Sequence, residues 1–92
     1  MPEATFTILN TYGLHIRPCA AIAKLAGDYP CNITLVKGNI RVNAKRIMEL
    51  LTLGAAYGDS IKVIATGPDS EAALHAFGEL IAHRFGVEEE VE

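Results

Sequence analysis

The feature that most restricts the fold is a pair of short segments with alternating side chains, joined by Gly38-Asn39. Residues 31–35 alternate apolar and polar side chains, which is the period of a half-buried strand. Ile40 and Val42 mark a second short strand with the same period. Glycine and asparagine between two such segments are a signal for a tight hairpin turn. The sequence therefore predicts two neighbouring antiparallel strands near the middle of the chain.

Two further strands and three helices are predicted around this hairpin. Alternation marks strands at residues 5–8 and 61–65, and apolar side chains at helical spacing mark helices at residues 16–26, 45–53 and 71–84. The order is therefore strand, helix, strand, strand, helix, strand, helix. Such an order favours an α+β fold, an open-faced sandwich in which the helices pack on one face of a single sheet.

Proline and glycine fix the predicted helix boundaries. Pro18 fits only in the first turn of a helix, where its missing N–H is not needed, so the first helix starts at His15 or Ile16. Gly27 and Gly54 are predicted to end the first and second helices. Residues 67–70 predict a turn that contains the N-cap of the last helix. The inward-facing side chains of that helix are predicted to be Leu74, Phe77, Ile81 and Phe85.

Length and charge exclude several kinds of protein. A chain of 92 residues is one domain, which we place at residues 1–87, followed by an acidic tail at residues 88–92. The formal net charge of -3 argues against nucleic acid as a partner, because binding phosphates needs a basic surface. No apolar run approaches the ~20 residues of a membrane span, and no signal peptide is visible. We therefore expect a cytoplasmic protein that does not insert into a membrane.

The cysteines and two of the histidines do not predict a metal site. Cys19 and Cys31 match no zinc-binding or CxxC spacing, so we expect two buried or half-buried thiols in a reducing cytosol. His75 and His83 are two turns apart on the last predicted helix, too far to share a metal ion. We expect no metal and no other cofactor.

His15 stands where a strand gives way to a helix, just before Arg17. The first N–H groups of a helix are unpaired and carry a partial charge of about +0.5, so they bind anions such as phosphate. The same charge disfavours a protonated imidazole, which would leave His15 neutral and nucleophilic. Arg17 adds a fork-shaped cation that can pair with phosphate oxygens. Reversible phosphoryl transfer needs this combination of nucleophile, anion site and charge stabilisation.

Spacing alone leaves other interpretations of His15 open. The side chain could merely cap the helix, with Arg17 an ordinary surface cation. A thiol enzyme could use Cys19 together with His15, although no third group that would orient the histidine is evident. A noncovalent regulatory module could have kept the fold and lost the transfer. The presence of both His15 and Arg17 argues against the last possibility.

Two segments of the chain resemble the signatures of one known family. Residues 13–20, Gly-Leu-His-Ile-Arg-Pro-Cys-Ala, resemble the phosphohistidine motif of the HPr family, whose core is Gly-Leu-His-x-Arg-Pro. Residues 42–48, Val-Asn-Ala-Lys-Arg-Ile-Met, resemble its second signature, which Leu53-Gly54 and Gly58 continue. The similarity extends to about Gly86, and the order of elements agrees. Two separate motifs at the right separation are a specific signal.

The resemblance implies a fold and a function. The fold would be βαββαβα, with a four-stranded antiparallel sheet and three helices on one face. The protein would be a monomeric carrier in a phosphoenolpyruvate-dependent sugar phosphotransferase system, not a stand-alone enzyme. Enzyme I would phosphorylate His15 on Nδ1, and an enzyme IIA component would receive the group. Arg17 would pair with the phosphate, beside the backbone N–H groups of Ile16 and Arg17. A nitrogen-type or regulatory branch, acting through phosphorylation-dependent binding, is the alternative.

The resemblance also implies a surface for docking partner proteins. It would consist of Ala20, Arg46, Ile47, Met48 and Leu51. The alternative for its apolar members is ordinary core packing. A short helix that is apolar nearly all round must leave some of these side chains exposed. We expect Leu50 and Leu53 to be the core members of this helix.

Three positions depart from the family pattern. Ile16 and Cys19 stand where small residues such as alanine are usual. Ile16 is expected to affect access to the site more than its chemistry, and Cys19 follows His15 by one turn. Arg46 stands where Gram-positive members carry a regulatory serine, so this chain offers no hydroxyl to the kinase at that position.

Overall fold

The computed structural model describes residues 3–9 and 16–83. The strands and helices of this part follow the predicted order: β1 (Glu3–Thr7), α1 (Ile16–Gly27), β2 (Asn32–Lys37), β3 (Ile40–Asn43), α2 (Ile47–Leu51), β4 (Ser60–Thr66) and α3 (Ser70–Ala82). The tail predicted at residues 88–92 lies outside the described residues. No helix in the described ranges is long and apolar enough to cross a bilayer.

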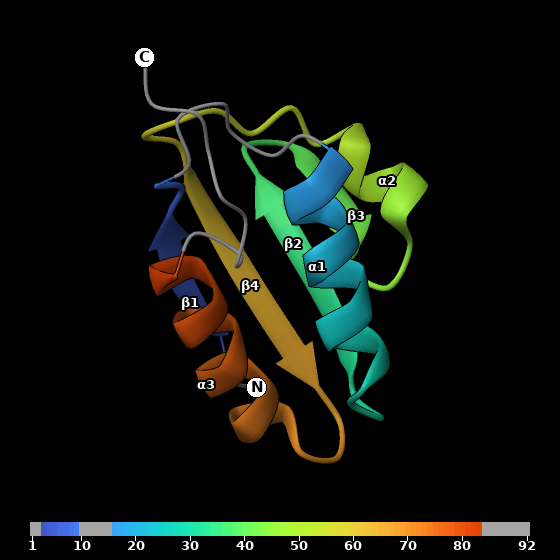
Figure 1. Ribbon diagram of the computed structural model, residues 1–92. Helices are drawn as coiled ribbons and strands as arrows, with labels where there is room; N and C mark the ends of the chain where they lie inside the picture. Colours follow the sequence, from blue (N-terminus) through green and yellow to red (C-terminus); the bar gives the residue numbers. More distant parts are fainter. Residues whose placement is uncertain (1–2, 10–15, 84–92) are drawn as a thin grey trace.

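The four strands form one sheet in the order β1-β4-β2-β3, and every neighbouring pair is antiparallel. Lys37 pairs with Ile40 across the tight turn, as the hairpin signal predicted. α1 and α3 lie side by side on one face of the sheet, and α2 lies beside α1 (Figure 1). The open-faced α+β sandwich is therefore confirmed.

The topology gathers the ends of several elements at one end of the molecule, which is at the top of Figure 1 and is called the upper end below. β1 and β2 end there, and β3 and β4 begin there. α1 also begins there, and residues 52–59, which join α2 to β4, cross this end. Segments that are far apart in the sequence therefore meet near the start of α1.

The core lies between the sheet and the helices. Strand residues alternate between buried and exposed positions, so Ile33, Leu35 and Val63 point toward the helices. Phe77 of α3 and Ile22 of α1 are fully buried in the same cluster. Burying each of these side chains stabilises the fold by about 1.5–3 kcal/mol relative to leaving it exposed.

Most of the predicted core positions of the helices are confirmed. Leu50 and Leu53 are fully buried, and Phe77 and Ile81 of α3 are buried as well. Leu74 is half-buried against the core. The prediction for Phe85 falls outside the described residues.

One local prediction is wrong, and a second is confirmed with an unexpected backbone. α2 is shorter than the predicted residues 45–53, because the backbone of Arg46 is extended (φ -118°, ψ 106°) and the helix ends before Gly54, whose φ is +70°. Asp69 is the N-cap of α3, but it has a left-handed backbone (φ 61°) and its side chain makes no capping hydrogen bond. The predicted turn and its N-cap are therefore confirmed.

Candidate functional site

The first turn of α1 is the part of the predicted site that the structure describes. α1 begins at Ile16, the residue that follows His15 in the sequence, whereas His15 itself lies outside the described residues. The N–H groups of Ile16 and Arg17 are the first of the helix, so no helical carbonyl accepts a hydrogen bond from them. They form the positive end of the helix dipole. This helix start agrees with the one inferred from Pro18.

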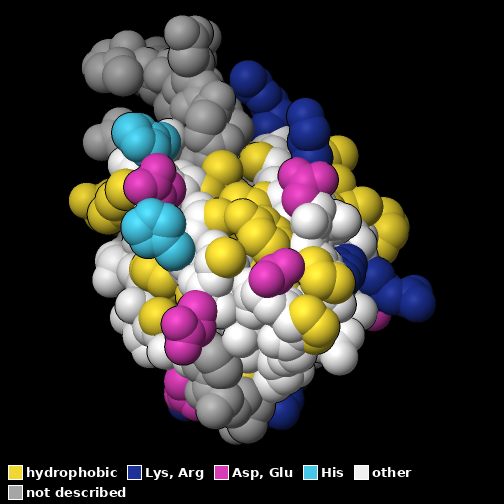
Figure 2. All heavy atoms as spheres, turned by 90° about the horizontal axis from the view of Figure 1, so that it is seen from below, with side chains coloured by type: hydrophobic (Ala, Val, Ile, Leu, Met, Phe, Trp, Pro, Cys, Tyr) yellow, Lys and Arg dark blue, Asp and Glu magenta, His cyan; other side chains and the backbone are white. Residues whose placement is uncertain are grey.

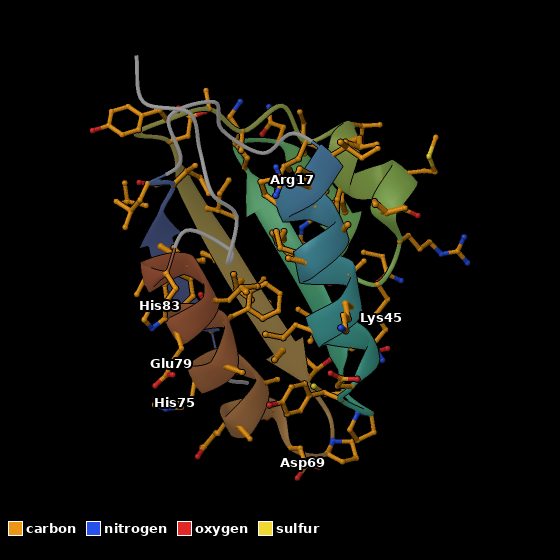
Figure 3. All side chains as sticks on the ribbon, in the orientation of Figure 1. Arg17, Lys45, Asp69, His75, Glu79 and His83 are labelled. Atoms are coloured by element: carbon orange, nitrogen blue, oxygen red, sulfur yellow. The ribbon has the colours of Figure 1, made fainter. Side chains whose placement is uncertain are left out.

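Arg17 is exposed in this first turn (Figure 3). The next two residues, Pro18 and Cys19, are buried, while Ile16 is 61% exposed. Within the described ranges, no carboxylate lies within ion-pair distance of the Arg17 guanidinium. Its N–H donors are therefore not committed to a carboxylate of this part of the chain and can pair with an anion at the start of α1.

The Cys19 thiol is a poor nucleophile in this fold. Cys19 is fully buried, and burial raises the pKa of its thiol from 9.0 to about 11. At neutral pH such a group is almost entirely protonated, and the reactive form of cysteine is the thiolate. This argues against the thiol-enzyme interpretation. Cys31 is also buried and neither cysteine forms a disulfide, as the sequence predicted.

Burial divides the five predicted docking residues, which we call the docking patch: Ala20, Arg46, Ile47, Met48 and Leu51. The side chain of Met48 is 73% exposed and that of Leu51 is 36% exposed, whereas Ile47 is half-buried against the core. Ala20 on α1 and Arg46 at the start of α2 are exposed. Because α1 and α2 pack against each other, the patch lies on two helices in contact.

Glu49 fixes the start of α2, a role that the sequence analysis missed. Its Oε1 accepts a hydrogen bond from the Asn43 N–H at 2.9 Å, and its Oε2 lies 3.9 Å from Nε of Arg46. The Lys45 N–H donates to Oδ1 of Asn43, and Lys45 Nζ donates to the Tyr29 carbonyl, both at 2.9 Å. The ion pair of Arg46 and Glu49 could have been predicted from the sequence, because opposite charges three residues apart are a signal for such a pair. The hydrogen bonds that join Asn43 to Glu49 and Lys45 to Tyr29 depend on how the chain folds.

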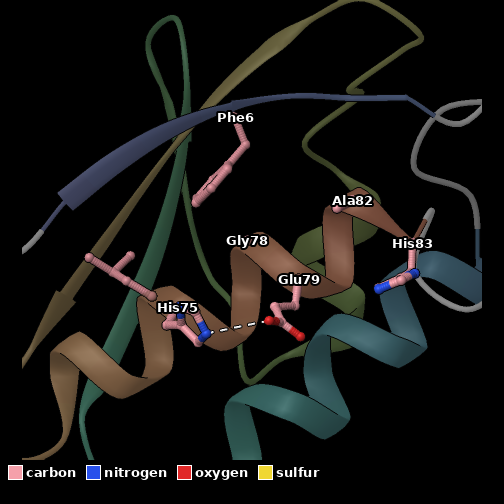
Figure 4. A pocket seen from close by; sticks show the side chains of 7 residues that line it. Phe6, His75, Gly78, Glu79, Ala82 and His83 are labelled. Carbon is pink, nitrogen blue, oxygen red and sulfur yellow. Dashed lines mark ion pairs between the residues drawn. The ribbon is translucent and has the colours of Figure 1, made fainter.

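His75 on α3 and His83, the C-cap of that helix, are exposed. Figure 2 shows both of them as separate exposed groups beside an apolar area. Nε2 of His75 lies 3.4 Å from Oε2 of Glu79. This face of α3 and Phe6 of β1 together line an open hollow of about 420 Å³ (Figure 4). In the described part of the chain, no group of three or more His, Cys, Asp or Glu residues could hold a metal ion.

Comparison with known proteins identifies the family. Residues 2–83 match the family described as the phosphorylation site of the PTS HPr component. The chain belongs to the HPr family. Its members named as phosphocarrier proteins include HPr of Treponema pallidum, which is 41% identical over 85 residues, covering 92% of this chain and 97% of the relative. NPr of Shewanella violacea is 35% identical over 83 residues, covering 90% and 91% of the two chains.

Solved HPr structures agree with the fold. The crystal structure of HPr-C-His from Thermoanaerobacter tengcongensis is 40% identical, has a TM-score of 0.90 and covers 97% of this chain and 100% of that chain. A crystal structure of an HPr dimer from the same organism has a TM-score of 0.75 and covers 95% and 100% of the two chains. This HPr-family chain is therefore a phosphocarrier protein of the phosphotransferase system.

Proposed function

We propose that this phosphocarrier accepts a phosphoryl group from phospho-enzyme I on Nδ1 of His15 and passes it to a histidine of an enzyme IIA component. In the first step the phosphorus–nitrogen bond of the donor breaks as a new one forms at His15. In the second step the bond at His15 breaks and the acceptor nitrogen takes the group. The observation that carries the proposal is the start of α1 at Ile16, directly after His15 in the sequence, with an exposed Arg17 in its first turn.

This arrangement supports transfer because it favours the phosphorylated state without a large rearrangement. The unpaired N–H groups of Ile16 and Arg17 and the helix dipole favour a dianion at the start of α1. The guanidinium of Arg17 can hold two of its oxygens. Buried Pro18 and Cys19 anchor the same turn in the core, so these donors keep their positions during transfer.

The function is tested by a relay reconstituted in solution. The purified chain is incubated with phosphoenolpyruvate and enzyme I, and an enzyme IIA component is then added. We expect one acid-labile, base-stable phosphate on the chain, which disappears as the IIA component becomes labelled. A chain that stays unlabelled under these conditions would contradict the proposal.

A nitrogen-type or regulatory role is the second candidate, favoured by the 35% identity to a protein named NPr. Parallel incubations with sugar-type and nitrogen-type IIA components separate the two. Faster transfer to the nitrogen-type component would assign the chain to that branch.

In either branch we propose that the protein is a cytoplasmic monomer. Light scattering should then give one species near the chain mass of 9.9 kDa.

Met48→Asp tests the docking patch. Met48 is the most exposed large apolar side chain in the described part of the chain, so a charge there should weaken binding to enzyme I about tenfold or more while leaving the fold intact. Isothermal titration calorimetry gives the Kd, and thermal unfolding should shift by less than about 4 °C. Ala72→Asp, on the exposed start of α3, is the matched control and should bind like the parent. Unfolding of the Met48 variant would instead show that this side chain is needed in the core.

Arg46→Ser tests the charge that replaces the regulatory serine. The Arg46 side chain is 71% exposed and only loosely paired with Glu49, so it can attract an acidic partner over a distance. We expect the variant to associate with enzyme I more slowly at low salt and with a flatter salt dependence. Stopped-flow measurements at several salt concentrations give both quantities. Arg41→Ser is the matched control, because it removes the same charge from the sheet face opposite the helices. Identical salt slopes for the parent and the Arg46 variant would rule out this role.

A further inference from the structure

Six large apolar side chains of the described residues are exposed: Leu9, Ile16, Ile40, Met48, Leu51 and Tyr57. They lie just after β1, at the start of α1, at the start of β3, on α2, and in the segment between α2 and β4. Figure 1 places these segments at the upper end or, for α2, beside it. A partner protein that covers this end would therefore bury apolar side chains.

Tyr57 is one of the exposed apolar residues to which the proposed function gives no role. Its side chain is 67% exposed, which makes it the most exposed aromatic residue in the described ranges. It lies in the segment of residues 52–59 that crosses the upper end (Figure 1). Tyrosine is among the residues that contribute most to binding at protein interfaces, because it buries a large area with few rotatable bonds.

Hydrogen bonds hold this segment against two strands. The Gly58 N–H donates to the Ile8 carbonyl and the Ile8 N–H donates to the Asp59 carbonyl, both at 2.9 Å. Lys37 Nζ donates to the Gly54 carbonyl at 3.0 Å and lies 3.6 Å from Oδ2 of Asp59. The backbone on both sides of Tyr57 is therefore fixed to the ends of β1 and β2.

The docking patch alone is too small for a specific complex. A specific interface covers about 800 Å² on each partner and about 20–30 residues. That is roughly a seventh of the accessible surface of this chain, 5348 Å². A partner that reaches a residue next to Ile16 must therefore cover more of the upper end than the five residues of the patch. The segment that carries Tyr57 is part of that end.

We propose that Tyr57 docks the phosphoryl donor, enzyme I, and that Lys37 holds the Tyr57 segment in its binding conformation. This inference rests on the proposed function and adds a contact to it. Because Lys37 and the strand hydrogen bonds already fix the backbone, docking loses little conformational entropy when it buries the ring. Lys37 acts through the Gly54 carbonyl and is a positioning residue.

Binding of enzyme I to single variants tests the contact. Tyr57→Ala should raise the Kd about tenfold or more, whereas Tyr57→Phe, which keeps the ring, should stay within about threefold of the parent. His75→Ala removes another exposed ring, from α3, and should leave the Kd unchanged. A photoreactive residue placed at position 57 should cross-link to enzyme I, and the same residue at position 75 should not.

A double-mutant cycle tests the role of Lys37. Lys37→Met removes its contacts to Gly54 and Asp59 and should raise the Kd of the parent about threefold. In the Tyr57→Ala background the same change should have little further effect, because the ring that it positions is absent. A purely structural role of Lys37 would weaken both backgrounds equally, and that result would overturn the positioning assignment.

Labelling of the parent chain is measured first, so that the two levels of the proposal are separated. If enzyme I does not phosphorylate the parent, the proposed function fails and the docking role fails with it. If the parent is phosphorylated but Tyr57→Ala binds enzyme I like the parent, the docking role alone is overturned. Weaker binding to enzyme IIA with unchanged binding to enzyme I would also overturn it, because Tyr57 would then serve the acceptor.

Discussion

His15→Ala is expected to abolish phosphorylation of the chain by phosphoenolpyruvate and enzyme I. The proposal assigns the covalent step to the imidazole of His15, and alanine offers no atom that could accept the phosphoryl group. The other candidate nucleophile in this region, the buried Cys19 thiol, has its pKa raised to about 11 and is protonated at neutral pH. Labelling should therefore fall to background, measured as acid-labile phosphate after separation of the proteins.

The other two histidines provide matched controls. His75 and His83 are exposed on α3, so His75→Ala and His83→Ala should fold and should be labelled like the parent. Circular dichroism and thermal unfolding show whether the His15 variant keeps the fold. Normal labelling of a folded His15→Ala variant would move the acceptor to another residue. Equal losses in all three variants would point to a general effect of removing imidazole groups.

The fold was predictable because its elements leave local patterns in the sequence. Alternation identified the four strands, and the Gly38-Asn39 turn fixed one antiparallel pair. Pro18 located the start of α1 to within one residue, since proline is restricted to the first turn of a helix. These features depend on residues within a few positions of one another, which is the range over which sequence patterns are informative.

The features that could not be predicted depend on contacts between distant segments. Lys37 binds the segment around Gly54 only because the hairpin and the end of α2 meet at the upper end. Glu49 reaches back to the Asn43 N–H, and the extended backbone of Arg46 shortens α2. No local pattern distinguishes such a helix from the longer one that its apolar residues favour.

The candidate site shows the same division. His15 and Arg17 are predicted by a contiguous motif, and the structure describes Arg17 as exposed, while His15 lies outside the described residues. The sequence could not divide the apolar residues of α2 with certainty, because all of them fit a buried helix. Packing against α1 and the sheet buries Leu50 fully and leaves Met48 mostly exposed. The docking role proposed for Tyr57 was not predicted, because one aromatic residue in a loop gives no periodic signal.

Arg17→Ala is expected to slow phosphoryl transfer about a hundredfold with little effect on folding. Removing one group that stabilises developing charge typically lowers a rate by about 10²–10³. Arg17 is exposed and pairs with no carboxylate of the described residues, so its loss should change stability by less than about 0.5 kcal/mol. Rapid-quench kinetics with phospho-enzyme I give the transfer rate, and thermal unfolding gives the stability.

Two further variants show which property of Arg17 matters. Arg41→Ala removes the same charge from the outer face of the sheet and should transfer at the parental rate, which excludes an effect of net charge. Arg17→Lys keeps a positive charge but loses the fork of donors, so it should recover only part of the rate. Parental transfer by Arg17→Ala would contradict the assigned role, and the N–H groups at the start of α1 would then have to stabilise the phosphoryl group without a side-chain cation.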